Sequence, residues 1–292
     1  MNVEEFLKYL QFEKRYSKHT LVAYENDILQ YQAFLKQTNL SFQNATHKDI
    51  RLWIIALIDN GTEARSVNRK ISSIRSFYKY ALKEAQIAEN PVLKVQSPKI
   101  VKKLPIFLSD QKMDILLDGD AFGQSFEGVR DKLIIELLFG TGIRLNELLT
   151  LKARNFLALE KTIKVLGKRN KERIIPLNAS LVNLLNFYLE IRLKQNFKFD
   201  SEMLVVTTKG QAGYPKLIYR IVNKYLEIIS TQSKKSPHIL RHSFATSLLN
   251  HGADINAIKD LLGHANLAAT QVYTHNSIER LKSIYKQAHP KA

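Results

Sequence analysis

The residues of this chain that could do chemistry are two arginines, two histidines, a lysine and a tyrosine. Arginine forks bind the oxygens of a phosphodiester bidentately and stabilise the extra negative charge of its transition state. A tyrosine hydroxyl becomes a nucleophile when a neighbour takes its proton, and its attack on phosphorus forms a phosphotyrosyl ester. A lysine can protonate the oxygen that leaves. Together these residue types favour phosphodiester chemistry.

Four of these residues lie near the C-terminus, between Ser236 and Tyr273. Ser236 is a good N-cap and Gly252 can take the left-handed conformation that ends a helix, so a helix is predicted between them. His238 and Arg241 are three residues apart and share one face of that helix. Both side chains can therefore face the same ligand.

A second helix is predicted from about residue 254 to 262, with Gly263 as its stop. His264 then lies in a turn, where it is free to point at a ligand. Asn266 can cap a third short helix, and this helix carries Tyr273.

A further arginine lies much earlier in the chain. The turn of Gly140, Thr141 and Gly142 ends an apolar helix and brings Arg144 to the start of the next helix, IRLNELLTL. Glu147 lies three residues beyond Arg144 on the same side, where it could hold the guanidinium group in place.

Residues 161–177 break the helical pattern. Alternating β-branched residues on the two sides of Gly167 predict a β-hairpin. Its tip, Lys168 to Lys171, is strongly cationic, and a lysine from this tip could donate a proton to the leaving oxygen.

The composition points to a polyanionic partner. The chain has 292 residues, enough for two domains, and Lys+Arg 44 against Asp+Glu 27 leaves a net charge of +17. Nucleic acid is the first candidate and an anionic membrane surface the second. The absence of cysteine, of an apolar core in the N-terminal MNVEEFLKYL, and of an apolar run long enough to span a membrane favours a cytoplasmic protein.

No cofactor is expected. The chain has no P-loop, no HExxH and no carboxylates spaced for paired metal ions. A phosphotyrosyl ester also stores the energy of the broken bond, so the chemistry requires no nucleotide and no metal.

Residues 1–95 are predicted to form a small bundle of about four helices, with caps at Ser17 and Thr46. The last helix has two different faces. Its apolar face consists of Val67, Ile71, Ile74, Tyr78 and Leu82. Its polar face, suited to a phosphate backbone, consists of Arg65, Arg69, Ser72, Ser76, Lys79 and Lys83.

Residues 96–104 are interpreted as a basic interdomain linker, because prolines bracket the segment and it has little to bury. Lys102 and Lys103 are its candidates for DNA contacts. The predicted domains are therefore 1–95 and 105–292, which could close on duplex DNA from opposite sides.

The order of the motifs resembles the signature of the tyrosine recombinase (phage integrase) family over nearly the whole chain. The motifs are TGIRLNEL, GKRNKER, SPHILRHSFAT and LLGHANLAATQVY. The resemblance implies a mainly α fold, with an N-terminal four-helix SAM-like core-binding bundle and an α-rich catalytic domain containing a small β-hairpin or sheet. The tail SIERLKSIYKQAHPKA is similar to that of bacterial Xer chromosome-dimer resolvases.

The resemblance also implies roles for the residues. Tyr273 would be the nucleophile that forms a 3′-phosphotyrosyl link. Arg144 and Arg241 would clamp the scissile phosphate, and Lys168 would be the general acid.

Three further residues would support this site. His264 would hydrogen-bond the phosphate, His238 would assist proton transfer, and Glu147 would support the arginine from behind. Lys164 and Lys171 lie near the predicted general acid and are the alternatives to it.

The implied partner is double-stranded DNA at a specific recombination site. In the family, the segment equivalent to 277–288 docks into a neighbouring protomer. The result is a tetramer on DNA, made of copies of one recombinase or of the recombinase and a paralogous one. Its apolar stripe, which includes Tyr285, has little obvious purpose on a monomer surface, although the helix could instead fold back on its own domain. The resemblance leaves open whether a septal DNA translocase is a further partner.

The predicted function is therefore a site-specific recombinase that cleaves and rejoins two duplexes through a Holliday junction, in chromosome dimer resolution at cell division. An integrase or transposase of a mobile element would use the same chemistry. The third alternative, from another class, is a non-catalytic DNA-binding protein that only holds phosphates.

Overall fold

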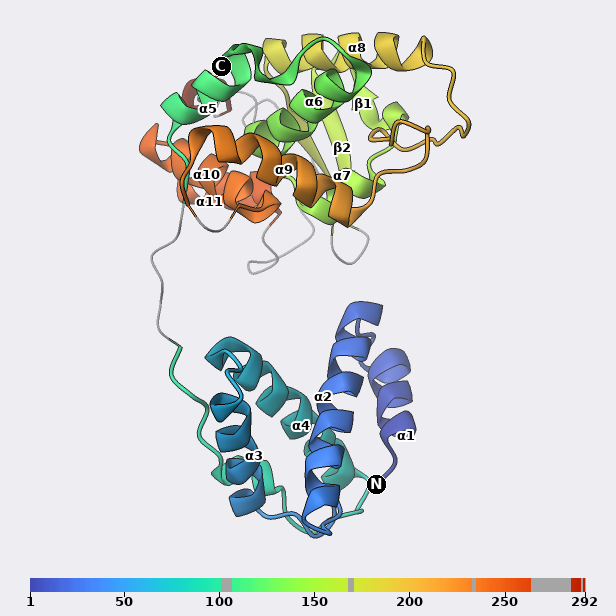
Figure 1. Cartoon of the computed structure of the whole chain (residues 1–292), viewed down its shortest axis with the longest axis vertical. Coiled ribbons are helices and arrows are strands. Elements are labelled where there is room, and N and C mark those ends of the chain that lie inside the picture. Colours follow the sequence, from blue (N-terminus) through green and yellow to red (C-terminus); the bar gives the residue numbers. More distant parts are fainter. Residues whose placement is uncertain (101–106, 168–170, 233–234, 264–284, 290, 292) are drawn as a thin grey trace. The chain divides into compact units, whose positions relative to one another are not determined.

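Two units make up the chain, Met1–Leu104 and Pro105–Ala292. The computed structural model describes residues 1–100, 107–167, 171–232, 235–263, 285–289 and 291 (Figure 1). Both units are built mainly from α-helices, which confirms the predicted class. The division falls at the C-terminal end of the segment interpreted as a linker, 96–104.

The described part of the N-terminal unit contains four α-helices. They are α1 (Val3–Lys8), α2 (Lys18–Gln37), α3 (His47–Asp59) and α4 (Ala64–Lys83). A π-helical turn (Tyr9–Glu13) continues α1, and a 3-10 turn (Pro91–Lys94) follows α4. The two predicted caps are confirmed, because the Ser17 hydroxyl accepts the Thr20 N–H at 3.3 Å and Thr46 forms a capping box with Asp49.

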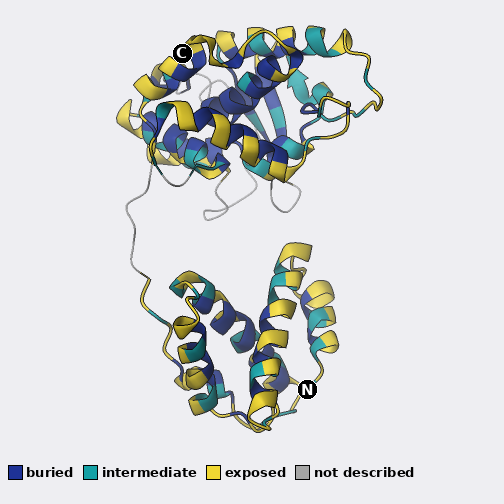
Figure 2. Cartoon of the chain, in the orientation of Figure 1, coloured by how far each residue is buried: buried dark blue, intermediate teal, exposed yellow. Residues whose placement is uncertain are grey.

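Helix α4 buries one face and exposes the other (Figure 2). The buried stripe runs through Val67, Ile71, Ile74 and Tyr78, as predicted, and then continues to Ala81. The prediction was wrong for Leu82, which is 41% exposed. Successive helical residues are rotated by about 100°, so the spacing that buries Ala81 turns Leu82 toward solvent.

The C-terminal unit is assembled around α6 (Phe126–Thr141). Its other helices are α5 (Asp110–Asp118), α7 (Leu145–Thr150), α8 (Ala179–Leu193), α9 (Pro215–Ile229), α10 (Pro237–Asn250) and α11 (Ile255–Leu262). Short 3-10 turns lie at Asp120–Phe122 and Ala153–Asn155. Nearly every side chain of α6 is buried, and it packs against α8 and α10 (Figure 2). A helix that is covered on all sides is the centre of a core.

A three-stranded antiparallel sheet completes this unit. Its strands are β1 (Phe156–Leu157), β2 (Thr162–Leu166) and β3 (Glu172–Pro176), in that order. The pairing of β2 with β3 confirms the predicted hairpin. Val165 lies opposite Arg173, and both side chains are buried, so an arginine occupies an inward position of the sheet.

The C-terminal segment folds onto its own unit at Tyr285–Ala288, a helical turn. The Tyr285 hydroxyl donates to the Gly140 carbonyl at 2.8 Å, and the ring Nε2 of buried His289 lies 3.0 Å from the same oxygen. For Tyr285 the structure shows the fold-back alternative, in which the hydroxyl binds a carbonyl near the end of α6 that needs a donor. Residues 277–284 lie outside the described part.

Candidate active site

Arg144 is positioned by the turn that follows α6. Gly142 ends α6 in the left-handed conformation, with φ of 60°, and a Cβ there would come within 2.5 Å of the Phe244 ring. Only glycine fits both constraints. Arg144 then serves as the N-cap of α7, where its backbone N–H donates to Glu147 Oε2 at 2.7 Å.

The carboxylate of Glu147 is the centre of the site. Arg144 Nη1 donates to its Oε1 at 2.8 Å. Arg173 donates with both terminal nitrogens, Nη1 to Oε1 at 2.8 Å and Nη2 to Oε2 at 2.9 Å. This is the parallel two-bond pairing that an arginine fork makes with a carboxylate.

Glu147 is ionised despite being buried, with its side chain only 4% exposed. Burial alone would raise the pKa of the Glu147 carboxyl. The hydrogen bonds and charge of Arg173, together with the backbone and side chain of Arg144, outweigh burial and lower the pKa to about 2.

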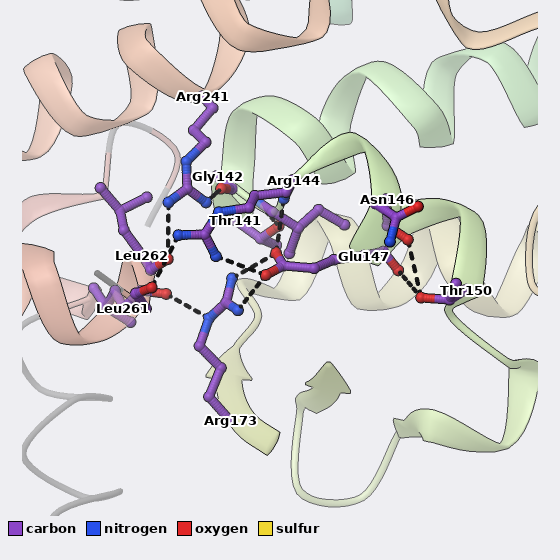
Figure 3. Close-up of polar contacts among 12 residues, drawn as sticks. Thr141, Gly142, Arg144, Asn146, Glu147, Thr150, Arg173, Arg241, Leu261 and Leu262 are labelled. Carbon is purple, nitrogen blue, oxygen red and sulfur yellow. Dashed lines mark hydrogen bonds and ion pairs between the residues drawn. The ribbon is translucent and has the colours of Figure 1, made fainter. Parts of the chain in front are cut away.

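Three arginines converge on the C-terminal end of α11, where helix carbonyls lack partners and the helix dipole is negative (Figure 3). Each arginine donates to one of three successive carbonyl oxygens. The bonds are Arg173 Nε to Leu261 at 2.9 Å, Arg241 Nη2 to Leu262 at 2.8 Å and Arg144 Nη2 to Gly263 at 2.9 Å. Arg241 Nη1 also donates to the Gly142 carbonyl.

The site carries excess positive charge. Glu147 supplies one negative charge to the three guanidinium groups around it. Burial, together with the charge of Arg144, lowers the pKa of Arg241 to about 10, so Arg241 stays charged at neutral pH. Two of the three positive charges are therefore uncompensated by Glu147, as a site for a phosphate group requires.

The fold brings together two of the six residues predicted to be catalytic, Arg144 and Arg241. His238 is exposed on α10, one turn before Arg241. The other three, Lys168, His264 and Tyr273, lie outside the described residues, although β2 ends just before Lys168 and Gly263 directly precedes His264.

The predicted DNA-binding face of α4 is exposed or half-exposed at all six residues. Two of its cations pair with acidic side chains of the described residues. Arg69 pairs with the buried carboxylate of Asp27, and Lys83 lies 3.5 Å from Glu13. Lys102 and Lys103 lie outside the described residues.

Sequence reasoning missed two groups of cations. One is a stripe on the exposed face of α9, Lys216, Arg220 and Lys224, whose spacing of four residues was visible in the sequence. The other is Arg173, which is buried beside Glu147. Its signal was the alternation in β3, which places Arg173 on the same side as Ile175.

Two absences hold for the part of the chain that the structure describes. It contains no helix long and apolar enough to cross a membrane. It also contains no group of three or more His, Asp or Glu residues that could hold a metal ion.

Known proteins match this chain over 99% of its length. A model of the phage integrase family matches residues 108–280, and a model of the N-terminal SAM-like domain of phage integrases matches residues 3–85. The chain is 38% identical to the tyrosine recombinase XerC of Chlorobaculum parvum, covering 99% of this chain and 94% of that protein. It is 35% identical to the tyrosine recombinase XerD of Staphylococcus haemolyticus, covering 99% of each.

A solved structure has the same fold. The XerH site-specific recombinase bound to its difH substrate, in a pre-cleavage complex, superposes with a TM-score of 0.70. The two chains share 22% identity, and the match covers 97% of this chain and 84% of that one. The predicted fold, a SAM-like helical bundle followed by an α-rich domain with a small sheet, is confirmed.

The pKa of Glu147 predicts how stability depends on pH. A carboxyl whose pKa falls from 4.5 to about 2 on folding stabilises the protein fully above pH 4.5 and loses that contribution as pH falls toward 2. Glu147→Gln should therefore cost about 3 kcal/mol at pH 7 and progressively less below pH 4.5. Denaturant titrations between pH 7 and pH 3 measure this difference.

The matched control is Glu202→Gln, because Glu202 pairs with Lys152 at the surface. This control should change stability little at any pH. A cost for Glu147→Gln that stays constant across the pH range would contradict the assigned ionisation.

Proposed function

The chain belongs to the phage integrase family and is a Xer-type tyrosine recombinase that cleaves and rejoins DNA at specific sites, and we propose that its arginine cluster binds the scissile phosphate. The observation that carries this proposal is the pair Arg144 and Arg241. These residues lie far apart in the sequence, yet they donate to the adjacent carbonyl oxygens of Gly263 and Leu262. Their guanidinium groups can therefore reach two oxygens of one phosphate.

The donors that would bind DNA are occupied by the protein's own backbone. An incoming phosphate oxygen can replace the carbonyls of Leu262 and Gly263, because charge-assisted bonds to an anion are stronger than those to a neutral carbonyl. Glu147 and Arg173 stay in place behind Arg144 during this exchange, so the clamp needs little reorganisation. A preorganised clamp stabilises the transition state more than it stabilises the substrate.

The family resemblance supplies the roles of the remaining residues in the proposed reaction. The Tyr273 oxygen attacks phosphorus, a 3′-phosphotyrosyl bond forms, and the bond to the 5′-oxygen breaks. Lys168 gives that oxygen its proton, while His264 hydrogen-bonds the phosphate and His238 assists proton transfer near the nucleophile. Attack by the 5′-hydroxyl of the second duplex reverses these steps and rejoins the strands.

Each unit offers a cationic face for the DNA backbone. In the N-terminal unit it is the exposed side of α4, with Arg65 and Lys79 among its cations. In the C-terminal unit it is the stripe of Lys216, Arg220 and Lys224 on α9. The net charge of +17 supports DNA binding, since phosphate contacts supply most of the affinity for any duplex.

A trapping experiment tests the chemistry. A suicide duplex, nicked beside the cleavage point, loses the short fragment that carries the new 5′-hydroxyl and so traps the covalent intermediate. The wild-type protein should form an adduct that resists denaturation, and Tyr273→Phe should form none, because phenylalanine has no nucleophilic oxygen. Adducts are counted on denaturing gels.

Arg241→Ala should reduce the adduct strongly while it leaves most of the binding in a gel shift, since many other cations hold the DNA. Adduct formation by Tyr273→Phe would show that another residue is the nucleophile. A wild-type chain that binds its site but never forms an adduct would support the binding-only alternative.

We further propose that the recombinase assembles as a tetramer through residues 277–288. Residues 285–289 dock on their own unit in the single chain, and on DNA the same segment would dock on a neighbouring protomer. Deleting 277–292 should therefore abolish cooperative binding to two adjacent sites and leave the affinity for one site nearly unchanged.

Gel shifts with one-site and two-site duplexes measure both quantities. Lys286→Ala is the control, because Lys286 lies in the segment but is exposed. Unchanged cooperativity in the truncated chain would mean that the tail serves only its own protomer.

The cellular role that we propose is chromosome dimer resolution in the cytoplasm at cell division. The similarity to proteins named XerC and XerD, over 99% of the chain in each case, supports this role. Mapping the sites that the protein occupies on its source chromosome should reveal one site near the replication terminus. Sites confined to the ends of mobile elements would instead indicate an integrase or transposase.

A further inference from the structure

We propose that Arg173 is a positioning residue for strand cleavage, which ties the hairpin of Lys168 and the segment leading to His264 to the Glu147–Arg144 pair. This inference rests on the proposed function of that site. Arg173 would not touch the DNA. It would act by fixing the backbone at the two points that lead to Lys168, the general acid, and to His264, the phosphate ligand.

Arg173 occupies a position where an apolar residue is expected. It lies at an inward site of β3, opposite Val165, and its side chain is only 5% exposed. Burying a guanidinium group costs free energy that its partners must offset, and apolar replacements of such pairs are often as stable or more stable. Stability alone therefore gives little reason for an arginine here.

Its donors join two separate elements of the site. Nη1 and Nη2 bind the two oxygens of Glu147 on α7, and Nε binds the Leu261 carbonyl at the end of α11. Because Arg173 itself belongs to β3, one planar group connects three elements. A lysine could not replace it, since an ammonium group is a single point charge without the fork.

The first consequence concerns the base of the hairpin. Gly167, the residue before Lys168, closes the loop by donating its N–H to the Lys171 carbonyl at 2.7 Å. A Cβ on Gly167 would lie 3.6 Å from Glu147 Oε1 and 3.7 Å from Arg173 Nη1. The backbone at the start of the loop therefore packs directly on the Arg173–Glu147 pair.

The second consequence concerns the end of α11. Gly263, which directly precedes His264, has φ of +64°, and a Cβ there would lie 3.3 Å from Arg173 Cδ. The Arg173 side chain therefore packs against the turn while its Nε donates to the Leu261 carbonyl. The direction in which the chain leaves α11 depends on this contact.

Arg173→Lys tests the proposal when it is assayed for both binding and chemistry. We expect the affinity for site DNA to stay nearly unchanged, while single-turnover adduct formation at saturating protein falls about 10²-fold, as misplacement by about 1 Å does. Adduct formation is then measured on a duplex in which sulfur replaces the bridging 5′-oxygen. A thiolate leaves without a proton, so the sulfur duplex bypasses the general acid.

The proposal predicts that the sulfur duplex restores the share of the rate that Arg173→Lys loses by misplacing Lys168, and leaves the share lost by misplacing His264. Arg241→Ala should show no such rescue, since it removes a phosphate ligand. Equal slowing of Arg173→Lys on both duplexes would overturn the link between Arg173 and the hairpin. A cleavage rate equal to wild type on ordinary DNA would overturn the proposal entirely.

Arg130→Lys is the matched control for stability. Arg130 is 5% exposed, pairs with the Asp131 carboxylate at 2.7 Å and reaches the Val206 carbonyl, all away from the arginine cluster. It should lower thermal stability and leave adduct formation unchanged. If Arg130→Lys slowed cleavage as much as Arg173→Lys, the effect would be one of general stability and the proposal would fail.

Gly167→Ala provides a second variant should Arg173→Lys not fold. Its methyl group would lie 3.2 Å from the Lys171 carbonyl, closer than an ordinary contact, so the backbone that closes the loop beside Arg173 would have to shift. The same rescue by sulfur is expected, and its absence would count against the proposal. A wild-type chain that forms no adduct in the parallel assay would refute the proposed function instead, so the two failures are distinguishable.

Discussion

The C-terminal unit depends on one buried negative charge. The Glu147 carboxylate binds the backbone where α7 begins, the side chain of Arg144 and the fork of Arg173. Without it, like-charged guanidinium groups would face one another in a poorly solvated place, which costs free energy. With it, the arginines lie close together while the site keeps an excess of positive charge. The same carboxylate thus stabilises the folded arrangement of the arginines and leaves a site that can attract an anion.

Local rules were enough to predict much of this arrangement. The glycine turn after the apolar helix, the helix start at Arg144 and the position of Glu147 on the same side all follow from spacing within one or two turns. The structure extends α6 to Thr141 and makes Gly142 the left-handed residue. The hairpin of β2 and β3 follows from alternation. These features need no knowledge of distant parts of the chain.

The roles of Arg173 and Tyr285 depend on distant contacts. An arginine in a short strand is usually a surface residue, and only the meeting of β3 with α7 and α11 makes Arg173 a buried partner. The sequence left open whether Tyr285 packs on a neighbouring protomer or on its own domain, because its acceptor, the Gly140 carbonyl, is remote in sequence. The predicted burial of Leu82 was wrong for a local reason, since the buried stripe ends on Ala81 and the next residue is turned away from the core. The meeting of Arg144 with Arg241 was predicted through the family resemblance, because spacing alone cannot bring them together.

The Leu262 and Gly263 carbonyls, which bind Arg241 and Arg144, have a consequence for the anions that the proposed phosphate site can accept. A free phosphate ion must displace them with no other contact to assist it. Duplex DNA that is already held by cationic side chains presents its phosphate at a high effective concentration, which for tethered groups reaches about the millimolar range or above. The backbone thus acts as a built-in competitive ligand. If the arginines bind the scissile phosphate as proposed, free anions compete with these carbonyls less well than a duplex that other cations already hold.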